Sequence, residues 1–215
     1  APITFAQDTP LYINKESDVE HDIYRATPYG DISAQLRGYC QEKNVNTLLH
    51  AISELQRIGY DISEKAIREG FAHVCQLTGL MGRWQVIGDE PYTVCDTGHN
   101  ADGMRIVAAQ LEALETDRIF AVMGFAKEKD LDKIMPLLPK RAHYIFTKAN
   151  IDRARSIEDI AAKAEALGLD YECKPTVKEA LAHARSMALA TDTIFIGGSN
   201  FVVAEVEEIT HIDEE

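Results

Sequence analysis

The feature that most restricts the fold is an alternation, from residue 82 onward, of short apolar segments with segments of helical periodicity. Several apolar segments are nearly uninterrupted, which is typical of strands covered on both faces. Alternating strands and helices predict an α/β fold with a mostly parallel sheet and flanking helices. The expected strands are residues 84–87, 92–95, 118–123, 143–146, 171–173 and 193–196, and the expected helices are residues 101–114, 131–137, 157–167, 177–189 and 201–208.

The first 81 residues follow a different pattern. Apolar positions over residues 45–58 fall on one helical face until Gly59, and Ser63 then offers a cap for a second helix. Residues 77–82 are expected to be a linker. Short strands are expected earlier, at residues 3–5, 11–13 and 21–24. Such a segment buries little surface alone, so we expect it to be the end of a larger domain.

Charge and cysteine spacing exclude several classes of protein. The net charge is −13, from 22 basic and 35 acidic side chains, which argues against nucleic-acid or anionic-membrane binding. The four cysteines include no Cys-x-x-Cys pair and the histidines include no His-x-x-x-His pair, so we expect free thiols and no metal site. No apolar run reaches the ~18 residues of a membrane helix, and no signal segment opens the chain. A cytoplasmic protein is expected.

The loop after the strand at residues 92–95 is the strongest candidate site. The strand ends in Asp96, a turn containing His99 follows, and a helix comes next. Loops at the carboxyl ends of parallel strands are where open α/β sheets bind ligands. Asp96 either accepts hydrogen bonds from ribose hydroxyls, or caps the helix or orders the loop. His99 is either a phosphate or substrate contact, or a structural loop residue.

Two further side chains are candidates with equally plain alternatives. Arg83 lies in a Gly-Arg-Trp turn and suits a phosphate group, because its guanidinium is planar and always charged, although a surface arginine is the simpler interpretation. With Asp96 and His99 it is expected to line one cleft. Asn44 either reads a purine edge or caps a helix, and the cap is favoured. Trp84 is expected in the core.

Three more polar loops follow strands on the same predicted edge of the sheet. They cover residues 124–130, 147–153 and 197–200. Lys129 and Asp130 belong to the first, where Asp130 can cap a helix, and Ser199 in the last can also cap one. Each loop alone is weak evidence for a site, but four polar loops at one edge together indicate ligand binding.

The segments taken in order resemble a known family. Leu36 to Asn44, Gly82-Arg83-Trp84-Gln85, Asp96-Thr97-Gly98-His99-Asn100, Lys129-Asp130 and Gly197 to Phe201 resemble the C-terminal part of folylpolyglutamate synthase/dihydrofolate synthase, of the Mur ligase superfamily. The resemblance implies that residues 1–81 are the incomplete C-terminal tail of a central ATPase domain and that residues 82–215 are the Rossmann-like C-terminal domain. The chain departs from the family at Cys40, Gly98, Ala101 and Glu128.

The resemblance also implies a reaction. In this family a folate or dihydropteroate carboxylate takes the γ-phosphoryl group of ATP, and the amine of L-glutamate attacks the acyl phosphate. Carried over by position, the adenine is assigned to Asn44, the ATP phosphates to Arg83, the ribose to Asp96, glutamate and the transferring phosphate to His99 and Ser199, and catalysis to His99, Lys129 and Asp130. The magnesium ligands and the phosphate loop of the family are expected upstream, so the chain alone is expected to be inactive. The parent protein is expected to be monomeric.

Two other functions stay open. One is a ligase of the same superfamily that adds amino acids to cell-wall precursors, although the Gly-Arg-Trp-Gln motif favours the folate branch. The other is a non-catalytic nucleotide-binding or interaction module.

Overall fold

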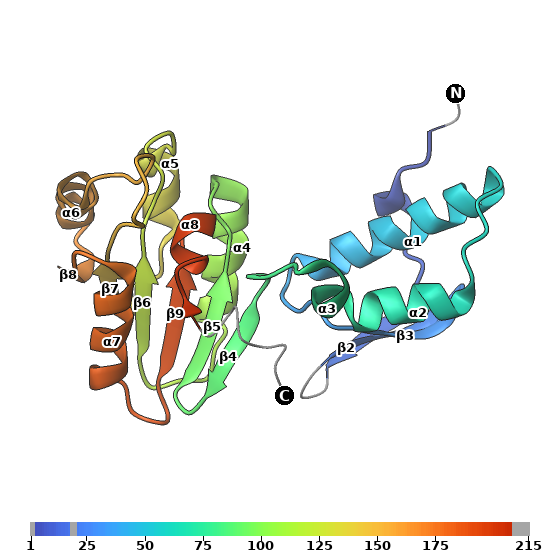
Figure 1. The fold of residues 1–215 in the computed structure, drawn as a ribbon, viewed down its shortest axis with the longest axis horizontal. Coiled ribbons are helices and arrows are strands. Elements are labelled where there is room, and N and C mark those ends of the chain that lie inside the picture. Colours follow the sequence, from blue (N-terminus) through green and yellow to red (C-terminus); the bar gives the residue numbers. More distant parts are fainter. Residues whose placement is uncertain (1–2, 18–20, 208–215) are drawn as a thin grey trace. The chain divides into compact units, whose positions relative to one another are not determined.

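A computed structural model describes residues 3–17 and 21–207. The chain divides into two compact units, Ala1–Met81 and Gly82–Glu215, which we call the N-terminal and C-terminal units and describe separately (Figure 1). No helix in the described part of the chain is both long enough and apolar enough to cross a bilayer. The interpretation of the first unit as the tail of an ATPase domain stays a prediction.

The C-terminal unit contains the predicted mostly parallel sheet. Its six strands are arranged in the order β4-β5-β9-β6-β7-β8, and β4 and β5 form the antiparallel pair while the other neighbours run parallel. Their bounds are β4 Gln85–Asp89, β5 Tyr92–Asp96, β6 Ile119–Met123, β7 Ala142–Phe146, β8 Asp170–Cys173 and β9 Thr193–Gly197. The expected α/β class is therefore confirmed, and β9, the last strand in the sequence, lies between β5 and β6.

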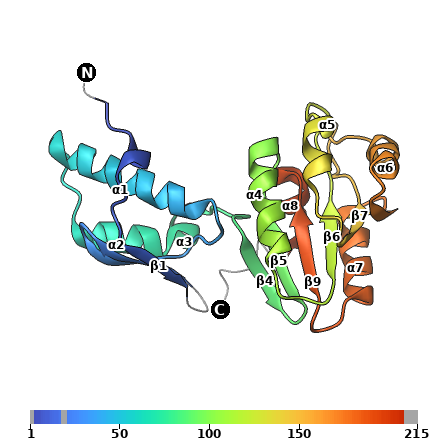
Figure 2. The same cartoon turned by 180° about the vertical axis from the view of Figure 1, so that it is seen from behind.

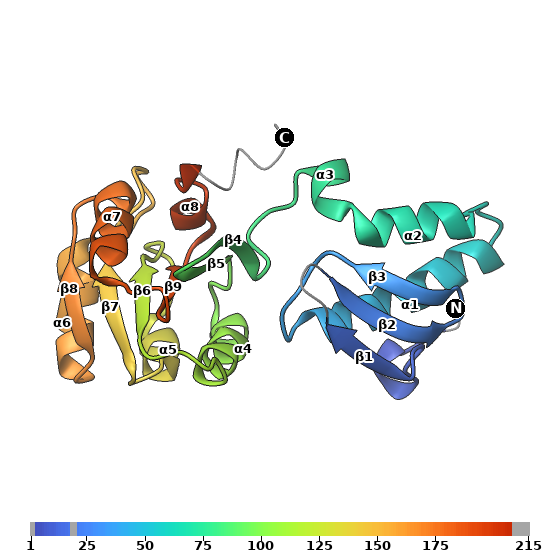
Figure 3. The ribbon, with the colours of Figure 1, turned by 90° about the horizontal axis from the view of Figure 1, so that it is seen from below.

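Helices cover both faces of this sheet (Figure 3). One apolar cluster joins α4, α5 and α6 to one face, and a second joins α7 and α8 to the other. Side chains cap five of the helices, as expected for Asp130 and Ser199. The bounds are α4 Ala101–Glu112, α5 Leu131–Ile134, a 3-10 turn η2 Met135–Leu137, α6 Ile157–Ala166, α7 Val177–Met187 and α8 Asn200–Val203. The helix expected over 201–208 is wrong in its length, because α8 ends at Val203 and residues 204–206 are not helical; residue 208 lies outside the described residues.

The N-terminal unit packs helices on an antiparallel sheet of order β1-β2-β3 (Figure 2). Ser63 caps α2, as predicted. The elements are the 3-10 turn η1 Ala6–Asp8, β1 Asn14–Ser17, β2 Asp22–Thr27, β3 Gly30–Ala34, α1 Gln41–Arg57, α2 Glu64–Ala72 and α3 Val74–Thr78. The linker expected at 77–82 therefore begins within a short helix.

Two predicted strands in this unit are wrong. Residues 3–5 and 11–13 are not strands. The chain turns at η1, where the Asp8 N–H donates to the Phe5 carbonyl at 3.1 Å, and a backbone bond to β2 appears at Ile13, whose N–H donates to the Arg25 carbonyl at 3.0 Å. Between these points a side chain of α1 binds the backbone. The Asn46 amide accepts a hydrogen bond from the Leu11 N–H at 2.8 Å and donates one to the Ala6 carbonyl at 2.6 Å. An amide side chain offers a donor and an acceptor together, so it binds both of these backbone groups.

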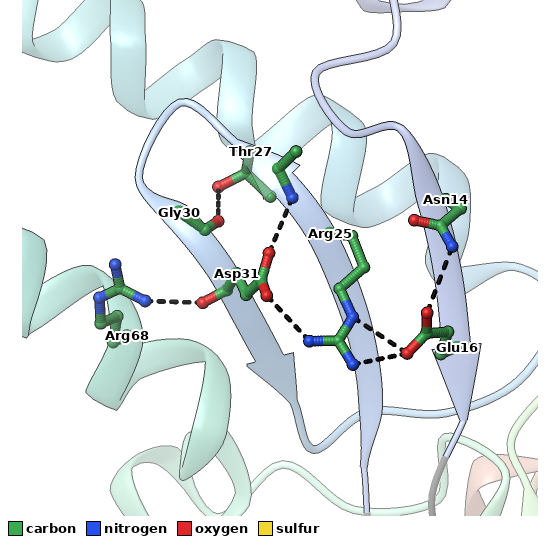
Figure 4. Close-up of polar contacts among 8 residues, drawn as sticks. Asn14, Glu16, Arg25, Thr27, Gly30, Asp31 and Arg68 are labelled. Atoms are coloured by element: carbon green, nitrogen blue, oxygen red, sulfur yellow. Dashed lines mark hydrogen bonds and ion pairs between the residues drawn. The ribbon is translucent and has the colours of Figure 1, made fainter.

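The face of the small sheet carries an ion network that sequence periodicity does not reveal (Figure 4). Arg25 of β2 bridges Glu16 of β1 and Asp31 of β3. Asp31 also accepts a hydrogen bond from the N–H of Ala26, whose φ of 55° is left-handed. Since these side chains are exposed, the network fixes local geometry more than it adds stability.

A cluster of basic side chains surrounds Glu172 on the edge strand β8. His143 of β7 and His183 of α7 approach one carboxylate oxygen of Glu172 at 3.1 and 2.8 Å, and Lys174 lies 3.2 Å from the other. The hydrogen bond with His183, followed by those with His143 and Lys174, lowers the pKa of Glu172 from 4.5 to about 2.

This cluster predicts a pH dependence of stability. Because its pKa is lower in the folded protein, Glu172 stabilises the fold above pH 4.5, and that contribution disappears as the pH falls to about 2. We expect Glu172→Gln to flatten the acid limb of a plot of unfolding free energy against pH, measured by urea titration. Replacing the exposed Glu115 by glutamine is the control, and equal effects of the two variants would contradict the prediction.

Candidate functional site

The Gly-Arg-Trp turn and the loop after β5 are adjacent in the C-terminal unit. The antiparallel register of β4 and β5 sets Gln85 opposite Cys95, which brings the turn beside Asp96. Gly82 and Trp84 both adopt left-handed conformations, with φ of 69° and 49°. The residue between them is Arg83, so the sharp turn determines where its side chain emerges.

Hydrogen bonds tie the turn to the loop. The carboxylate of Asp96 accepts one from the Trp84 N–H at 2.9 Å and another from the Gly98 N–H at 2.7 Å. The carbonyl of Gly82 accepts from both the N–H and the hydroxyl of Thr97, at 2.9 and 3.0 Å. Asp96 therefore orders the loop, one of its two expected structural roles, while the helix cap belongs to Asn100.

Asp96 and Arg83 interact electrostatically. Burial raises the pKa of the Asp96 carboxyl above its usual value, whereas hydrogen bonds from the two backbone amides act in the opposite direction. The positive charge of Arg83 also lowers this pKa. Nη1 of Arg83 donates a hydrogen bond to the Gly82 carbonyl at 3.5 Å. The Gly-Arg-Trp turn and the Asp96 loop are bonded to each other, and the cleft expected to be lined by Arg83, Asp96 and His99 stays a prediction.

His99 lies in the same loop, and one of its ring nitrogens forms a hydrogen bond within the loop. Its Nδ1 lies 2.9 Å from the carbonyl of Thr97, which only accepts, so Nδ1 carries the hydrogen. In the neutral ring, Nε2 is then an acceptor on a half-buried side chain. The backbone N–H of Gly103 is not available to a ligand, because the Asn100 side chain accepts it at 2.8 Å. The helix start is thus closed by its own cap.

The loops after β6 and β9 pack against each other. Gly198 has a φ of 84°, and a Cβ there would approach the Gly124 carbonyl at 2.8 Å. Ser199 is buried, and its hydroxyl accepts from the Phe201 N–H at 3.2 Å. Its capping role is present, and a contact with a substrate stays a prediction.

Lys129 and Asp130 lie in the loop after β6. Asp130 caps α5 and pairs with Lys133 at 3.0 Å, which lowers the pKa of its carboxyl. Sequence reasoning overlooked Arg155, which donates hydrogen bonds to the carbonyls of Lys127 and Lys129 and so fixes the backbone of this loop. The only sequence signal for Arg155 is its position just after the polar loop at 147–153. Catalytic roles for Lys129 and Asp130 remain predictions.

Asn44 lies in the first turn of α1, in the N-terminal unit. The expectation that it caps this helix is wrong, because α1 begins three residues earlier, where the N–H of Gln41 reaches the Gly38 carbonyl at 3.0 Å. The exposed Asn44 side chain instead donates to Oε1 of Gln41 at 3.1 Å. Its assignment to the adenine is not tested by this geometry.

A comparison with protein-family models decides the family. The model of the Mur ligase glutamate ligase domain matches residues 82–200, more than half of the 215 residues. The chain belongs to the Mur ligase family. The match begins at the Gly-Arg-Trp turn and ends at the loop after β9, so it spans all six strands of the C-terminal unit. The predicted membership of this family is confirmed.

Similar proteins agree with this assignment. A probable bifunctional folylpolyglutamate synthase/dihydropteroate synthase from Haloferax volcanii is 32% identical over 81% of this chain and 20% of that protein. A UDP-N-acetylmuramoyl-L-alanyl-D-glutamate–2,6-diaminopimelate ligase from Bacillus cereus is 26% identical over 87% of this chain and 39% of its own length. A solved structure, Mycobacterium tuberculosis folylpolyglutamate synthase complexed with ADP, has a TM-score of 0.74 at 23% identity.

The chain spans only part of these relatives. The structural match covers 90% of this chain but 45% of the M. tuberculosis chain. At 23% identity the match shows that the two chains share a fold. It therefore confirms the α/β architecture of the Mur ligase C-terminal domain.

Proposed function

We propose that this chain is part of an ATP-dependent ligase that joins L-glutamate to a folate or dihydropteroate carboxylate through an acyl phosphate. The observation that carries the proposal is the Mur ligase glutamate ligase domain, with Arg83, Asp96 and His99 gathered by two adjoining loops. The printed names of the relatives from H. volcanii and M. tuberculosis support the folate substrate, and the ADP in the latter structure supports a nucleotide.

The residues would divide the work between binding and charge neutralisation. Arg83 would bind phosphate oxygens with its fork of donors. Asp96 has lone pairs left after its two backbone bonds, and these would accept from ribose hydroxyls. His99, through Nε2, and Lys129 would orient and neutralise the transferring phosphoryl group. The amine of glutamate would then attack the acyl carbon as phosphate leaves.

A divalent ion would supply further charge neutralisation at the phosphates. The described residues contain no group of three or more side chains able to ligate a metal. From the resemblance to the family, we propose that Mg²⁺ is held by parts of the protein outside this chain. The purified chain alone is then expected to form no product from ATP, glutamate and dihydropteroate, as followed by phosphate release, and turnover above background would contradict that expectation.

Replacing Arg83 tests the nucleotide site. We expect Arg83→Ala to weaken ADP binding by about tenfold or more, because a charge-assisted hydrogen bond contributes ~1.5–3 kcal/mol. Isothermal titration calorimetry measures the change. Arg105→Ala is the matched control, since Arg105 is an exposed arginine that pairs with Asp102 on its own helix. Equal affinities for both variants would favour a non-catalytic module.

A cell-wall ligase is the second candidate, and the match to the B. cereus protein favours it. Competition between dihydropteroate and a UDP-muramoyl peptide, assayed by ATP-dependent product formation with the complete enzyme, separates the two. We also propose that the enzyme binds no nucleic acid. We further propose that it is monomeric, and light scattering after size-exclusion chromatography measures the molar mass that checks this.

A further inference from the structure

The loops after β6 and β7 are bonded to each other along their backbones. Ala126 and Ala154 form an antiparallel bridge, and a backbone hydrogen bond of 2.8 Å flanks it on each side. These two bonds run from the Lys127 N–H to the Arg153 carbonyl and from the Arg155 N–H to the Phe125 carbonyl. Backbone pairing therefore holds the first loop as far as Lys127.

The side chain of Arg155 extends this hold to Lys129. Its Nη2 donates to the carbonyls of Lys127 and Lys129, the second at 2.8 Å. A guanidinium is planar and carries five N–H donors, so it can bind two carbonyls of one loop together. The Arg155 side chain is 21% exposed, and its Nη1 lies 3.8 Å from the carboxylate of Asp159 on α6. Hydrogen bonds from a charged donor are stronger than neutral ones, so Arg155 restrains the backbone at Lys129.

The two lysines of this loop differ in what their side chains bind. Nζ of Lys127 donates to the Asp152 carbonyl at 2.6 Å. The half-buried Lys129 side chain forms neither a hydrogen bond nor an ion pair within the described part of the chain. The backbone of Lys129 is held on both sides, because its N–H donates to the Ala126 carbonyl at 3.1 Å and its carbonyl accepts from Arg155. Lys129 thus combines a restrained backbone with a side chain that the fold does not hold.

A restrained backbone matters for a group that neutralises charge during a reaction. Such a group stabilises a transition state most when it is in place beforehand, since no reorganisation is then needed. We propose that Arg155 is a positioning residue of the ligase, which holds the loop after β6 so that Lys129 is in place when the phosphoryl group is transferred. The inference rests on the proposed function, in which Lys129 neutralises that group.

Arg141 provides a matched control for Arg155. Its Nη2 also donates to two backbone carbonyls, those of Leu111 and Leu114, at 3.0 and 2.8 Å. It precedes β7, so it lies at the amino end of that strand, whereas the polar loops follow the carboxyl ends. Replacing either arginine by alanine removes the same kind of bond, but only Arg155→Ala releases the backbone of Lys129.

The turnover of the complete enzyme with ATP, glutamate and dihydropteroate is the first test. We expect Arg155→Ala to lower kcat by about tenfold or more while the KM for ATP changes by about twofold or less, and Arg141→Ala to keep kcat within about twofold. In the Lys129→Ala background, Arg155→Ala should cause no further loss, because residues that act together are not additive. Equal kcat values for Arg155→Ala and Arg141→Ala would refute the inference.

Hydrogen exchange of the Lys129 N–H is a second test, which needs no activity. In ¹⁵N-labelled samples of this chain, we expect exchange about tenfold faster in Arg155→Ala than in the unaltered protein, and an unchanged rate in Arg141→Ala. An unchanged rate in Arg155→Ala would show that its side chain does not restrain the loop, and the inference would fail.

The outcomes separate this inference from the proposed function. If Lys129→Ala lowers kcat but Arg155→Ala does not, the role of Arg155 is refuted and that of Lys129 stands. If the complete enzyme forms no product from these substrates, or if Lys129→Ala leaves kcat unchanged, both are refuted. Far-UV circular dichroism checks that each variant is folded, and Arg155→Gln replaces Arg155→Ala should the alanine variant unfold.

Discussion

Replacing Asp96 by alanine is expected to lower the free energy of unfolding of the C-terminal unit by about 3 kcal/mol, because two backbone N–H groups lose their acceptor. These belong to Trp84, which is 6% exposed, and to the half-buried Gly98. Trp84 also has a left-handed backbone that this bond helps to hold. It is the only tryptophan, so its fluorescence during guanidinium denaturation reports on this unit.

Asp96→Asn separates the structural role of Asp96 from its proposed ribose contact. Asparagine keeps one oxygen acceptor, so its loss of stability should lie between those of the unaltered protein and Asp96→Ala. A carboxylate that served only a ligand would be dispensable to the free protein, and Asp96→Ala would then unfold at the same denaturant concentration. That result would contradict the loop-ordering role.

Replacing Gly124 by alanine is expected to destabilise the C-terminal unit by about 2–3 kcal/mol, through overpacking where the strands end. A Cβ at Gly124 would lie 2.5 Å from the backbone carbonyl of Thr147 and 2.9 Å from a methyl group of Val202. A backbone carbonyl cannot rotate away as a side chain can, so β6 and β7 must separate locally. The midpoint of guanidinium denaturation measures the loss.

Gly70 provides the matched control for this substitution. It lies within α2, its φ is not left-handed, and a Cβ there would meet nothing within 4 Å. Gly70→Ala is therefore expected to stabilise the N-terminal unit by about 0.5–1 kcal/mol, because alanine loses less backbone entropy in a helix than glycine. A neutral or stabilising effect of Gly124→Ala would contradict the predicted overpacking, because it would mean that the loops after β6 and β7 accommodate a Cβ without strain.

The loop that follows Gly124 connects this packing to the proposed chemistry. It contains Lys129, whose carbonyl is bound by Arg155 from the loop after β7. A shift at Gly124 is therefore expected to displace the backbone that Arg155 holds at Lys129. In the complete enzyme, Gly124→Ala should reduce turnover beyond the effect on folded fraction.

The sequence by itself determined the elements of the C-terminal unit. Alternation of apolar and helical segments gave all six strands within a few residues, because periodicity is a local property of the chain. Local chemistry also gave the caps Ser63, Asp130 and Ser199. Since parallel strands end at one edge of a sheet, the grouping of polar loops there followed as well.

Only the tertiary structure decided how these elements meet. The placement of β9 between β5 and β6, the two backbone bonds of Asp96 and the anchoring of the Lys129 loop by Arg155 each join residues that are far apart in sequence or lie in separate elements. The same holds for residues 6–11, where the Asn46 side chain binds the Ala6 carbonyl and the Leu11 N–H. The periodicity of apolar residues in one segment indicates which side of its helix or strand is buried. A hydrogen bond between two polar groups in different segments depends on the distance between those segments, which neither segment's sequence specifies alone.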